Sequence, residues 1–218
     1  MEIKRQITVA GQSYWANVPD QCPICHRHSE VMFIKADLVN QHKGAQVVLQ
    51  CAFAGCRSYF ICYYGKPPAG EVLATKPIKP DSTAFPDTVK ELSPTFIDIY
   101  SEADEAAQLR LSQIAGPGYR KAFEFLIKDY AKSLAPDKVG DIEKMFSGKV
   151  VDDFVADARI QAVAKRCLWL GNDETHYLRK WTDHDMADLK TLIRLCVSWI
   201  EIDRLSKSYV SSMPEAQP

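Results

Sequence analysis

The chain has 218 residues, 46% of them hydrophobic, and its 27 Lys and Arg residues nearly balance its 28 Asp and Glu residues. This length suffices for one medium domain plus a small one, and the hydrophobic content excludes wholesale disorder. A formal net charge of -1 excludes an overall basic field that would hold phosphate backbones by counterion release. Any contact with nucleic acid therefore has to be local.

Two cysteine pairs in the first third of the chain predict a metal site. They are Cys22, Cys25, Cys51 and Cys56. Two residues separate the first pair and four separate the second, a spacing typical of a tetrahedral Zn2+ site with four thiolate ligands. We expect Pro23 and Gly55 to supply the fixed and the permissive backbone that such turns need.

Other arrangements of these thiols stay open from the sequence. The two pairs could instead be disulfides of a secreted domain, or unrelated pairs of buried thiols. In addition, Cys62, His26 and His28 lie close enough along the chain to replace one of the four ligands.

The compartment is predicted from the first eight residues and from the cysteine count. Glu2, Lys4 and Arg5 interrupt the apolar residues there, so no continuous hydrophobic stretch of signal-peptide length is present. Seven cysteines also leave an odd thiol, and no apolar run approaches the length of a transmembrane helix. We therefore expect a cytoplasmic protein that makes no contact with a membrane.

The N-terminal part is predicted to be a small β domain, a zinc ribbon. Residues 30–35, 46–51 and 58–64 are rich in Val, Ile, Phe and Tyr and are bounded by the cysteine turns, so they predict strands. Residues 65–100 then hold half of the 12 prolines of the chain and predict an extended connector.

From residue 101 onwards the periodicity predicts helices. A first helix is expected over 101–114, with Ser101 as its N-cap. The sequence Gly-Pro-Gly at 116–118 is expected to break the chain, and an amphipathic helix is expected over 119–134.

The remaining helices are predicted in the same way. A short segment at 139–146 precedes a longer helix over 151–170, for which Gly171 is the expected C-cap. Thr182 together with Asp185 is expected to open a long final helix. Four or five helices joined by short loops imply an antiparallel bundle.

The predicted fold class is therefore α+β, with a zinc ribbon followed by a mainly α bundle. The predicted parts are the ribbon at 1–64, the connector at 65–100, the bundle at 101–208 and a flexible tail at 209–218.

The densest polar segment outside the ribbon is 171–177, between two strongly periodic helices. The amide of Asn172 could orient a ligand or a water, and the unperturbed pKa of a histidine such as His176 suits proton transfer near neutral pH. The plainer alternative is that Gly171 and Asn172 cap a helix while His176 makes a structural contact.

Arg120 and Glu124 lie one helical turn apart and could form a surface ion pair. Alternatively, they could face His176 across the bundle, where Arg120 would bind a phosphate and Glu124 would orient the imidazole.

Two weaker possibilities complete the candidate sites. His176, His184, Asp183 and Asp185 could form a second metal site, although their spacing matches no motif with a known mechanism. We expect the tryptophans near the helical stripes to pack in the core rather than to stack on bases. They are Trp169, Trp181 and Trp199.

The order of these segments resembles a known family. A cysteine-paired ribbon precedes Gly-Pro-Gly-Tyr-Arg-Lys-Ala-Phe-Glu-Phe-Leu at 116–126 and Leu-Trp-Leu-Gly-Asn-Asp-Glu-Thr-His-Tyr at 168–177. The pattern resembles the bacterial domain of unknown function 4145, which is related to the HEPN (higher-eukaryote and prokaryote nucleotide-binding) helical superfamily. The resemblance covers about residues 101–205 and implies a HEPN-like helical bundle.

Many HEPN proteins are metal-independent endoribonucleases of toxin–antitoxin, restriction and antiviral systems, in which a dimer provides Arg-polar-x-x-x-His motifs. In this chain Asn172 matches the polar position and His176 the histidine, but Gly171 stands where active ribonucleases have arginine. Cleavage needs a cation near the scissile phosphate, so the resemblance implies binding rather than cleavage unless Arg120 or Arg166 takes that place.

The sequence thus favours a zinc-binding, nucleic-acid- or nucleotide-associated accessory module of a bacterial defence or stress system, without strong catalysis. Two alternatives stay open: a HEPN-type endoribonuclease that uses His176, and an interaction or dimerisation module with a structural zinc. Whether the chain is an enzyme is left undecided. The expected partners are a second copy of the chain in a homodimer, RNA, DNA or a nucleotide, and a defence-system protein.

Overall fold

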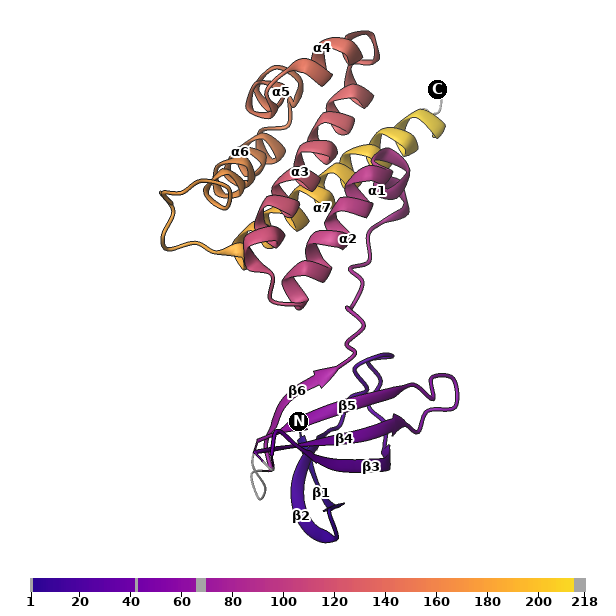
Figure 1. Cartoon of the computed structure of the whole chain (residues 1–218). Coiled ribbons are helices and arrows are strands. Elements are labelled where there is room, and N and C mark those ends of the chain that lie inside the picture. The colour runs from indigo at the N-terminus through magenta and orange to yellow at the C-terminus, as the bar shows by residue number, and fades with distance from the viewer. Residues whose placement is uncertain (1, 42, 66–69, 214–218) are drawn as a thin grey trace. The chain divides into compact units, whose positions relative to one another are not determined.

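The computed structural model describes residues 2–41, 43–65 and 70–213. The chain forms two compact units, residues 1–81 and 82–218. The regular elements of the first unit are strands and those of the second are helices, within the described ranges (Figure 1). The predicted α+β class is confirmed.

The N-terminal unit contains two antiparallel sheets. Strands β1 (Glu2–Val9) and β2 (Gln12–Pro19) form a hairpin. The second sheet has four strands in the order β3-β4-β5-β6, all antiparallel. These strands are β3 (Val31–Val39), β4 (Gly44–Cys51), β5 (Tyr59–Tyr64) and β6 (Val72–Lys76).

Strand β4 shows how this unit builds its core and positions one of the four predicted ligands. Alternate residues of β4 are at most 2% exposed, and their partners on β5 are also buried. The buried pairs are Ala45 with Tyr64, Val47 with Cys62 and Leu49 with Phe60. Because side chains alternate between the two faces of a strand, Cys51 at the end of β4 points to the same buried face.

The three strands that the sequence predicts correspond to β3, β4 and β5. The hairpin of β1 and β2 and the edge strand β6 were not predicted. Residues 65–100 are also not one extended connector, because they contain β6, helix α1 (Asp87–Leu92) and the start of helix α2 (Pro94–Gln108). Residues 66–69 of that predicted connector lie outside the described residues.

Two prolines explain this difference. Pro86 is the N-cap of α1 and Pro94 is the first residue of α2, where a proline without a backbone N–H is tolerated. Phe85, Val89 and Phe96 are buried in the core of the helical unit. The prolines therefore start helices that pack.

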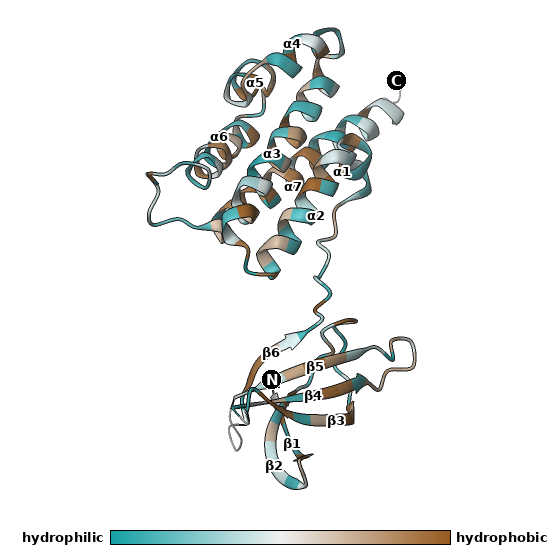
Figure 2. Cartoon of the chain, viewed as in Figure 1, coloured by the Kyte–Doolittle hydropathy of each residue, from teal (hydrophilic) through white to brown (hydrophobic). Residues whose placement is uncertain are grey.

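The C-terminal unit has helix α3 at its centre, in contact with α2, α5, α6 and α7. The helices that follow α2 are α3 (Ser112–Leu134), α4 (Val139–Lys144), α5 (Ser147–Phe154), α6 (Ala158–Asp173) and α7 (Met186–Ser212), with a short 3-10 turn (Pro136–Lys138) before α4. Each long helix carries hydrophobic residues interspersed with hydrophilic ones (Figure 2). This amphipathic pattern buries one side of each helix.

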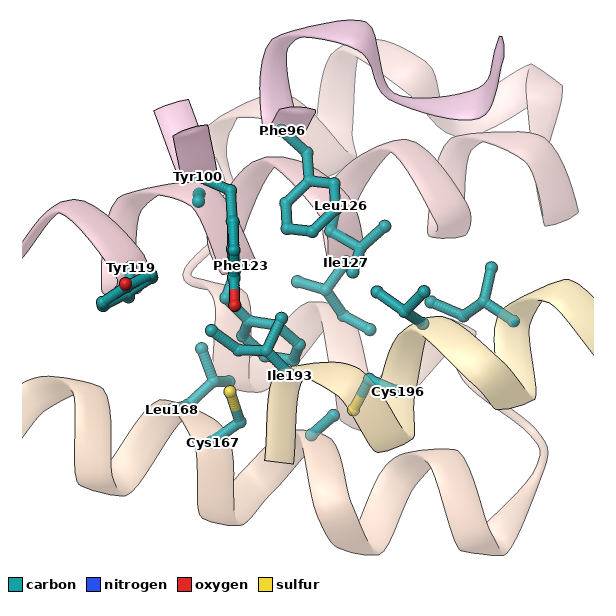
Figure 3. Close-up of a cluster of buried hydrophobic side chains, with 14 of the residues drawn as sticks. Phe96, Tyr100, Tyr119, Phe123, Leu126, Ile127, Cys167, Leu168, Ile193 and Cys196 are labelled. Atoms are coloured by element: carbon teal, nitrogen blue, oxygen red, sulfur yellow. The ribbon is translucent and has the colours of Figure 1, made fainter. Parts of the chain in front are cut away.

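Buried side chains from four helices meet in one cluster (Figure 3). The labelled members are Phe96 and Tyr100 of α2; Tyr119, Phe123, Leu126 and Ile127 of α3; Cys167 and Leu168 of α6; and Ile193 and Cys196 of α7. Burial raises the pKa of Cys196 to about 12 and raises the pKa of Cys167 well above its usual range. Both thiols therefore act as apolar packing groups.

The predicted helix break at 116–118 is wrong, because α3 runs through Pro117 without interruption. The two glycines beside Pro117 are needed for packing instead. A Cβ at Gly118 would lie 2.8 Å from the Cβ of Ala103 on α2, and a Cβ at Gly116 would lie 2.7 Å from the Cβ of Glu174. Ser101 is likewise inside α2, where its hydroxyl donates to the carbonyl of Ile97.

Further helix ends differ from the prediction. The helix predicted over 151–170 is two helices, α5 and α6, and Asp157 caps α6 by accepting from two backbone N–H groups. Gly171 is not a C-cap, since α6 continues to Asp173. The N-cap of α7 is Asp185 in a capping box with Asp188, so Thr182 plays no part in it. The final helix also extends into the predicted tail, and residues 214–218 lie outside the described residues.

Replacing Gly118 by Ala is expected to lower the free energy of unfolding by about 1–3 kcal/mol, because the added methyl group overlaps Ala103 in a packed interface. The matched control is Gly148→Ala in α5, where nothing lies within 4 Å of the new Cβ. That change should raise the free energy by about 0.4–1 kcal/mol. Chemical denaturation of both variants checks the pair, and equal effects would contradict the packing role.

Among the residues that the structure describes, no helix is both long and apolar enough to cross a bilayer.

Candidate metal centre and polar cluster

Four cysteine side chains meet in the N-terminal unit, two from the connection between β2 and β3 and two from the end of β4 and the turn that follows it. The sulfur atoms of Cys22, Cys25, Cys51 and Cys56 all lie within 4.8 Å of one another. Cys22 Sγ is 3.9 Å from Cys56 Sγ, and Cys25 Sγ is 3.9 Å from Cys51 Sγ. Four sulfurs placed tetrahedrally at about 2.3 Å from one Zn2+ ion are about 3.8 Å apart. The predicted residues thus come together at metal-binding distance.

The two cysteine turns have the same backbone construction. The N–H of Cys22 donates to the carbonyl of Arg27 at 3.0 Å, and the N–H of Cys51 donates to the carbonyl of Ser58 at 3.0 Å. The residue after the second cysteine of each turn has a positive φ, 56° at His26 and 50° at Arg57. This left-handed conformation bends each turn back on itself and aims both of its sulfurs at one point.

Gly55 has a different role from the predicted one. Its φ is not in the left-handed region, and a Cβ there would lie 2.8 Å from the ring of Phe53. The guanidinium of Arg27 in the first turn lies 4.4 Å from the centre of that ring. Gly55 therefore makes room for an aromatic ring that joins the two turns.

Groups next to the sulfurs affect their protonation. Burial raises the pKa of Cys22 to about 12. Ser58, through its side chain and its backbone, lowers the pKa of Cys56 to about 7. The Oγ of Ser29 also lies 3.4 Å from the Sγ of Cys51. Four thiolates that converge on one position are a donor set that suits Zn2+. The bound cation would in turn favour the deprotonated form of each thiol.

The alternative ligands lie elsewhere. His26 Nε2 is 3.3 Å from Asp81 Oδ1, and His28 Nδ1 is 3.3 Å from Asp20 Oδ2. Cys62 is buried within β5, with its sulfur 3.7 Å from the hydroxyl of Thr75. All seven cysteines are free thiols, so the structure contains no disulfide among them.

A second group of predicted residues meets at the contact between α3 and α6. Arg120 Nε donates to Asn172 Oδ1 at 3.0 Å, and Arg120 Nη1 donates to Glu124 Oε2 at 3.2 Å. Glu124 also pairs with Lys128 at 2.9 Å. Burial opposes the charge of Glu124, but Lys128 and Arg120 outweigh it and hold the pKa of Glu124 below its usual range. Arg120 and Glu124 are thus more than an exposed i,i+4 pair.

Gly171 permits this arrangement. A Cβ at position 171 would lie 2.6 Å from Cδ of Arg120, so the arginine side chain crosses the helix directly over the glycine. The side chain of Arg120 is 20% exposed. Arg166, the other candidate cation, donates instead to the carbonyl of Ala162 on its own helix.

His176 lies just beyond α6, and its backbone N–H donates to the carbonyl of Asn172 at 3.1 Å. Its exposed side chain lines an open hollow of about 830 Å³ together with Asn172, and Arg120 is not among the lining residues. The hollow is lined by Trp169, Asn172, Asp173, His176, Tyr177, Leu178, Lys180 and Trp181. Asn172 therefore connects the Arg120 cluster to the hollow that contains His176.

The expectation that Trp169 and Trp181 pack in the core is wrong. They are 46% and 43% exposed, and their rings stack on each other with centroids 6.2 Å apart and planes 5° apart. Trp199 does pack against the core. A signal was present, since the buried residues Ala164, Cys167, Leu168 and Gly171 follow the three-and-four spacing of one face of α6, and Trp169 does not.

The proposed second metal site does not form. His184 Nδ1 lies 3.1 Å from Asp188 Oδ2, and Asp185 accepts from two backbone N–H groups at the start of α7. Within residues 2–41, 43–65 and 70–213, the cysteine cluster is the only group of three or more ligand side chains at metal-binding distance.

No family model, no curated protein and no solved structure matches this chain. The resemblance to the domain of unknown function 4145 stays a prediction.

Proposed function

We propose that this chain is a zinc-binding, nucleic-acid- or nucleotide-associated module whose helical unit is HEPN-like, and that it has no strong catalytic activity. The observation that carries the proposal is the position of Asn172, which joins the Arg120 cluster to an open hollow lined by His176 and exposed aromatic rings. The role as an accessory of a bacterial defence or stress system rests on the family resemblance, as does the homodimer.

The metal has a structural role in this proposal. Cys22, Cys25, Cys51 and Cys56 would hold one Zn2+ ion, and four protein ligands leave no open position for substrate. When bound, the ion supplies folding energy by joining the two cysteine turns. The chain's own contribution is the backbone of those turns, which already aims the sulfurs inward.

Weak catalysis follows from the contacts of Arg120. Its guanidinium donates to Asn172 and pairs with Glu124, so its charge is already partly compensated. A ribonuclease needs an uncompensated cation beside the scissile phosphate to stabilise the charge that develops there. An arginine committed to two neighbours is better suited to holding Asn172 in place.

An endoribonuclease is the second candidate, and one observation favours it. Arg120 crosses over Gly171, the position where the resembling ribonucleases have arginine, so a neighbouring helix brings a guanidinium to that place. In such an enzyme His176 would accept the proton of the attacking 2′-hydroxyl. Arg120 would have to leave Glu124 to reach the phosphate.

Two measurements on the zinc-loaded chain test these candidates. The proposal expects single-stranded RNA, or a nucleotide, to bind and to remain intact in buffer with EDTA, with zinc retention checked in the same samples. Binding to none of these probes would refute it. Cleavage that disappears in both His176→Ala and Arg120→Ala, with unchanged circular dichroism, would establish the endoribonuclease instead.

A further inference from the structure

We infer that the loop between α6 and α7, residues 174–185, together with Trp169 forms a stacking site for an unpaired nucleobase. This inference rests on the proposed function and names the class of ligand, which is an unpaired base that can stack on a protein ring. The ligand would come from a single strand of nucleic acid or from a free nucleotide, which share this chemistry. The rings that would stack on the base are those of Trp169 and Trp181.

The first step of the argument is exposure. The loop exposes its large apolar side chains instead of burying them: Tyr177 is 101% exposed, Leu178 is 77% exposed and Trp181 is 43% exposed. Such exposure of aromatic rings is costly unless something covers them, and every base has a π-face that can do so. Trp169 lies parallel to Trp181, which gives the two rings a common orientation.

The second step is that the loop is held in shape. Asp173, only 5% exposed, accepts the backbone N–H of Lys180 at 2.7 Å and that of Trp181 at 2.5 Å. Arg179 pairs with Glu174 at 2.9 Å and also donates to the carbonyl of His184 at 2.7 Å. These contacts fix the backbone under Trp181, so the aromatic surface exists before a ligand arrives.

The third step is the distribution of charge. Most acidic groups around the loop are committed: Asp173 and Asp185 each accept from two backbone amides, Glu174 pairs with Arg179, and Asp188 pairs with His184. Asp183 is exposed and is the exception. Lys180 lines the hollow, and its ammonium group has no partner among the residues that the structure describes. Proteins that bind single-stranded nucleic acid combine these two features, a cation that contacts phosphate and exposed aromatic rings that stack on bases.

A second hollow extends the surface. The two tryptophans also line a hollow of about 390 Å³ on the side of α7, together with Arg166, Leu170, His184, Asp188, Thr191 and Leu192. The tryptophan pair thus borders both hollows, with Lys180 lining one and Arg166 lining the other. An adjacent phosphate of the same strand would lie near one of these cations. A single strand of nucleic acid could therefore run from one hollow to the other across Trp169 and Trp181.

The test measures fluorescence anisotropy of labelled single-stranded RNA and DNA of mixed sequence with the zinc-loaded full chain. Trp169→Ala and Trp181→Ala should each weaken binding by about 5- to 150-fold, the loss expected for one stacked base. Trp181→Phe should restore part of the affinity, which separates stacking from misfolding. The matched control is Trp15→Ala, because Trp15 is 66% exposed on β2 and belongs to the other unit.

Competition with the four nucleoside monophosphates identifies the source of the base. Tryptophan-dependent binding of the oligonucleotides, or of a mononucleotide alone, supports the stacking site and names its source. Binding that both tryptophan variants leave within 2-fold of the wild type overturns the site but leaves the proposed function standing. Failure to bind any oligonucleotide or mononucleotide overturns both.

Discussion

Replacing Cys51 by Ala is expected to release the metal and to abolish cooperative folding of the N-terminal unit. Structural Zn2+ contributes about 10–16 kcal/mol of apparent binding free energy at pH 7 in zinc-finger peptides. The stability of a whole domain is only about 5–15 kcal/mol, so loss of one of four ligands removes a decisive share of it. Cys51 is fully buried at the end of β4, so its replacement by the smaller alanine also leaves a cavity in the core.

Two readouts check this prediction on the full chain. Metal analysis should find one zinc per wild-type chain and little in the variant. The backbone amide resonances of β4 and β5 report on the N-terminal unit and should lose their dispersion. Cys62→Ala is the matched control, because Cys62 is equally buried in β5 but lies outside the cluster, and it should keep its zinc. A Cys51→Ala protein with wild-type zinc content and well-dispersed amide resonances in β4 and β5 would refute the metal site.

The cysteine cluster was predictable because the pattern that forms it is local in sequence. Two short cysteine turns determine most of the geometry, and only the pairing of the turns depends on the sheet. The β1–β2 hairpin was missed although its signal was present: Tyr14, Ala16 and Val18 alternate along β2. Its turn uses Ala10 and Gly11 with φ of 50° and 80°, and Ala is an unusual residue for the left-handed region.

The polar cluster could be named from the sequence but not assembled from it. The contact of Arg120 with Asn172 joins residues of two helices, and it depends on the absence of a side chain at Gly171. From the sequence alone, a glycine near the end of a helical pattern predicts a C-cap. In the folded chain the same glycine can instead leave room for a side chain of a neighbouring helix, as Gly171 does for Arg120. The α3 glycines that flank Pro117 were misinterpreted for the same reason.

Asp104→Ala is expected to lower the free energy of unfolding of the helical unit by about 2–4 kcal/mol. The carboxylate is 5% exposed and accepts from Lys190 at 2.5 Å, from Tyr119 at 2.7 Å and from Thr83 at 2.9 Å. It therefore joins α2 to α3 and α7 and to the segment before α1. Removing it leaves the ammonium of Lys190, whose side chain is only 29% exposed, without its counter-charge.

A control on the same helix separates this effect from the loss of a charge in general. Asp98 is exposed on α2, and Asp98→Ala should change the free energy of unfolding by no more than about 0.5 kcal/mol. A further variant, Asp104→Ala with Lys190→Met, should recover part of the loss, because it removes both charges instead of leaving one. Denaturant unfolding of the three proteins measures these differences, and equal losses in Asp98→Ala and Asp104→Ala would contradict the network.

The same network predicts a dependence on pH. Burial opposes ionisation of Asp104, but Lys190, Tyr119 and Thr83 outweigh it and hold the pKa of Asp104 below its usual value. A group whose pKa is lower in the folded state contributes its stability above the unfolded pKa, about 3.9 for Asp, and loses it as the pH falls through the folded pKa. The difference between wild type and Asp104→Asn should therefore be constant near neutral pH and should shrink below about pH 4. If this difference in free energy of unfolding stays unchanged down to pH 2, the charge of Asp104 contributes nothing to stability. The side chain would then act through its hydrogen bonds alone.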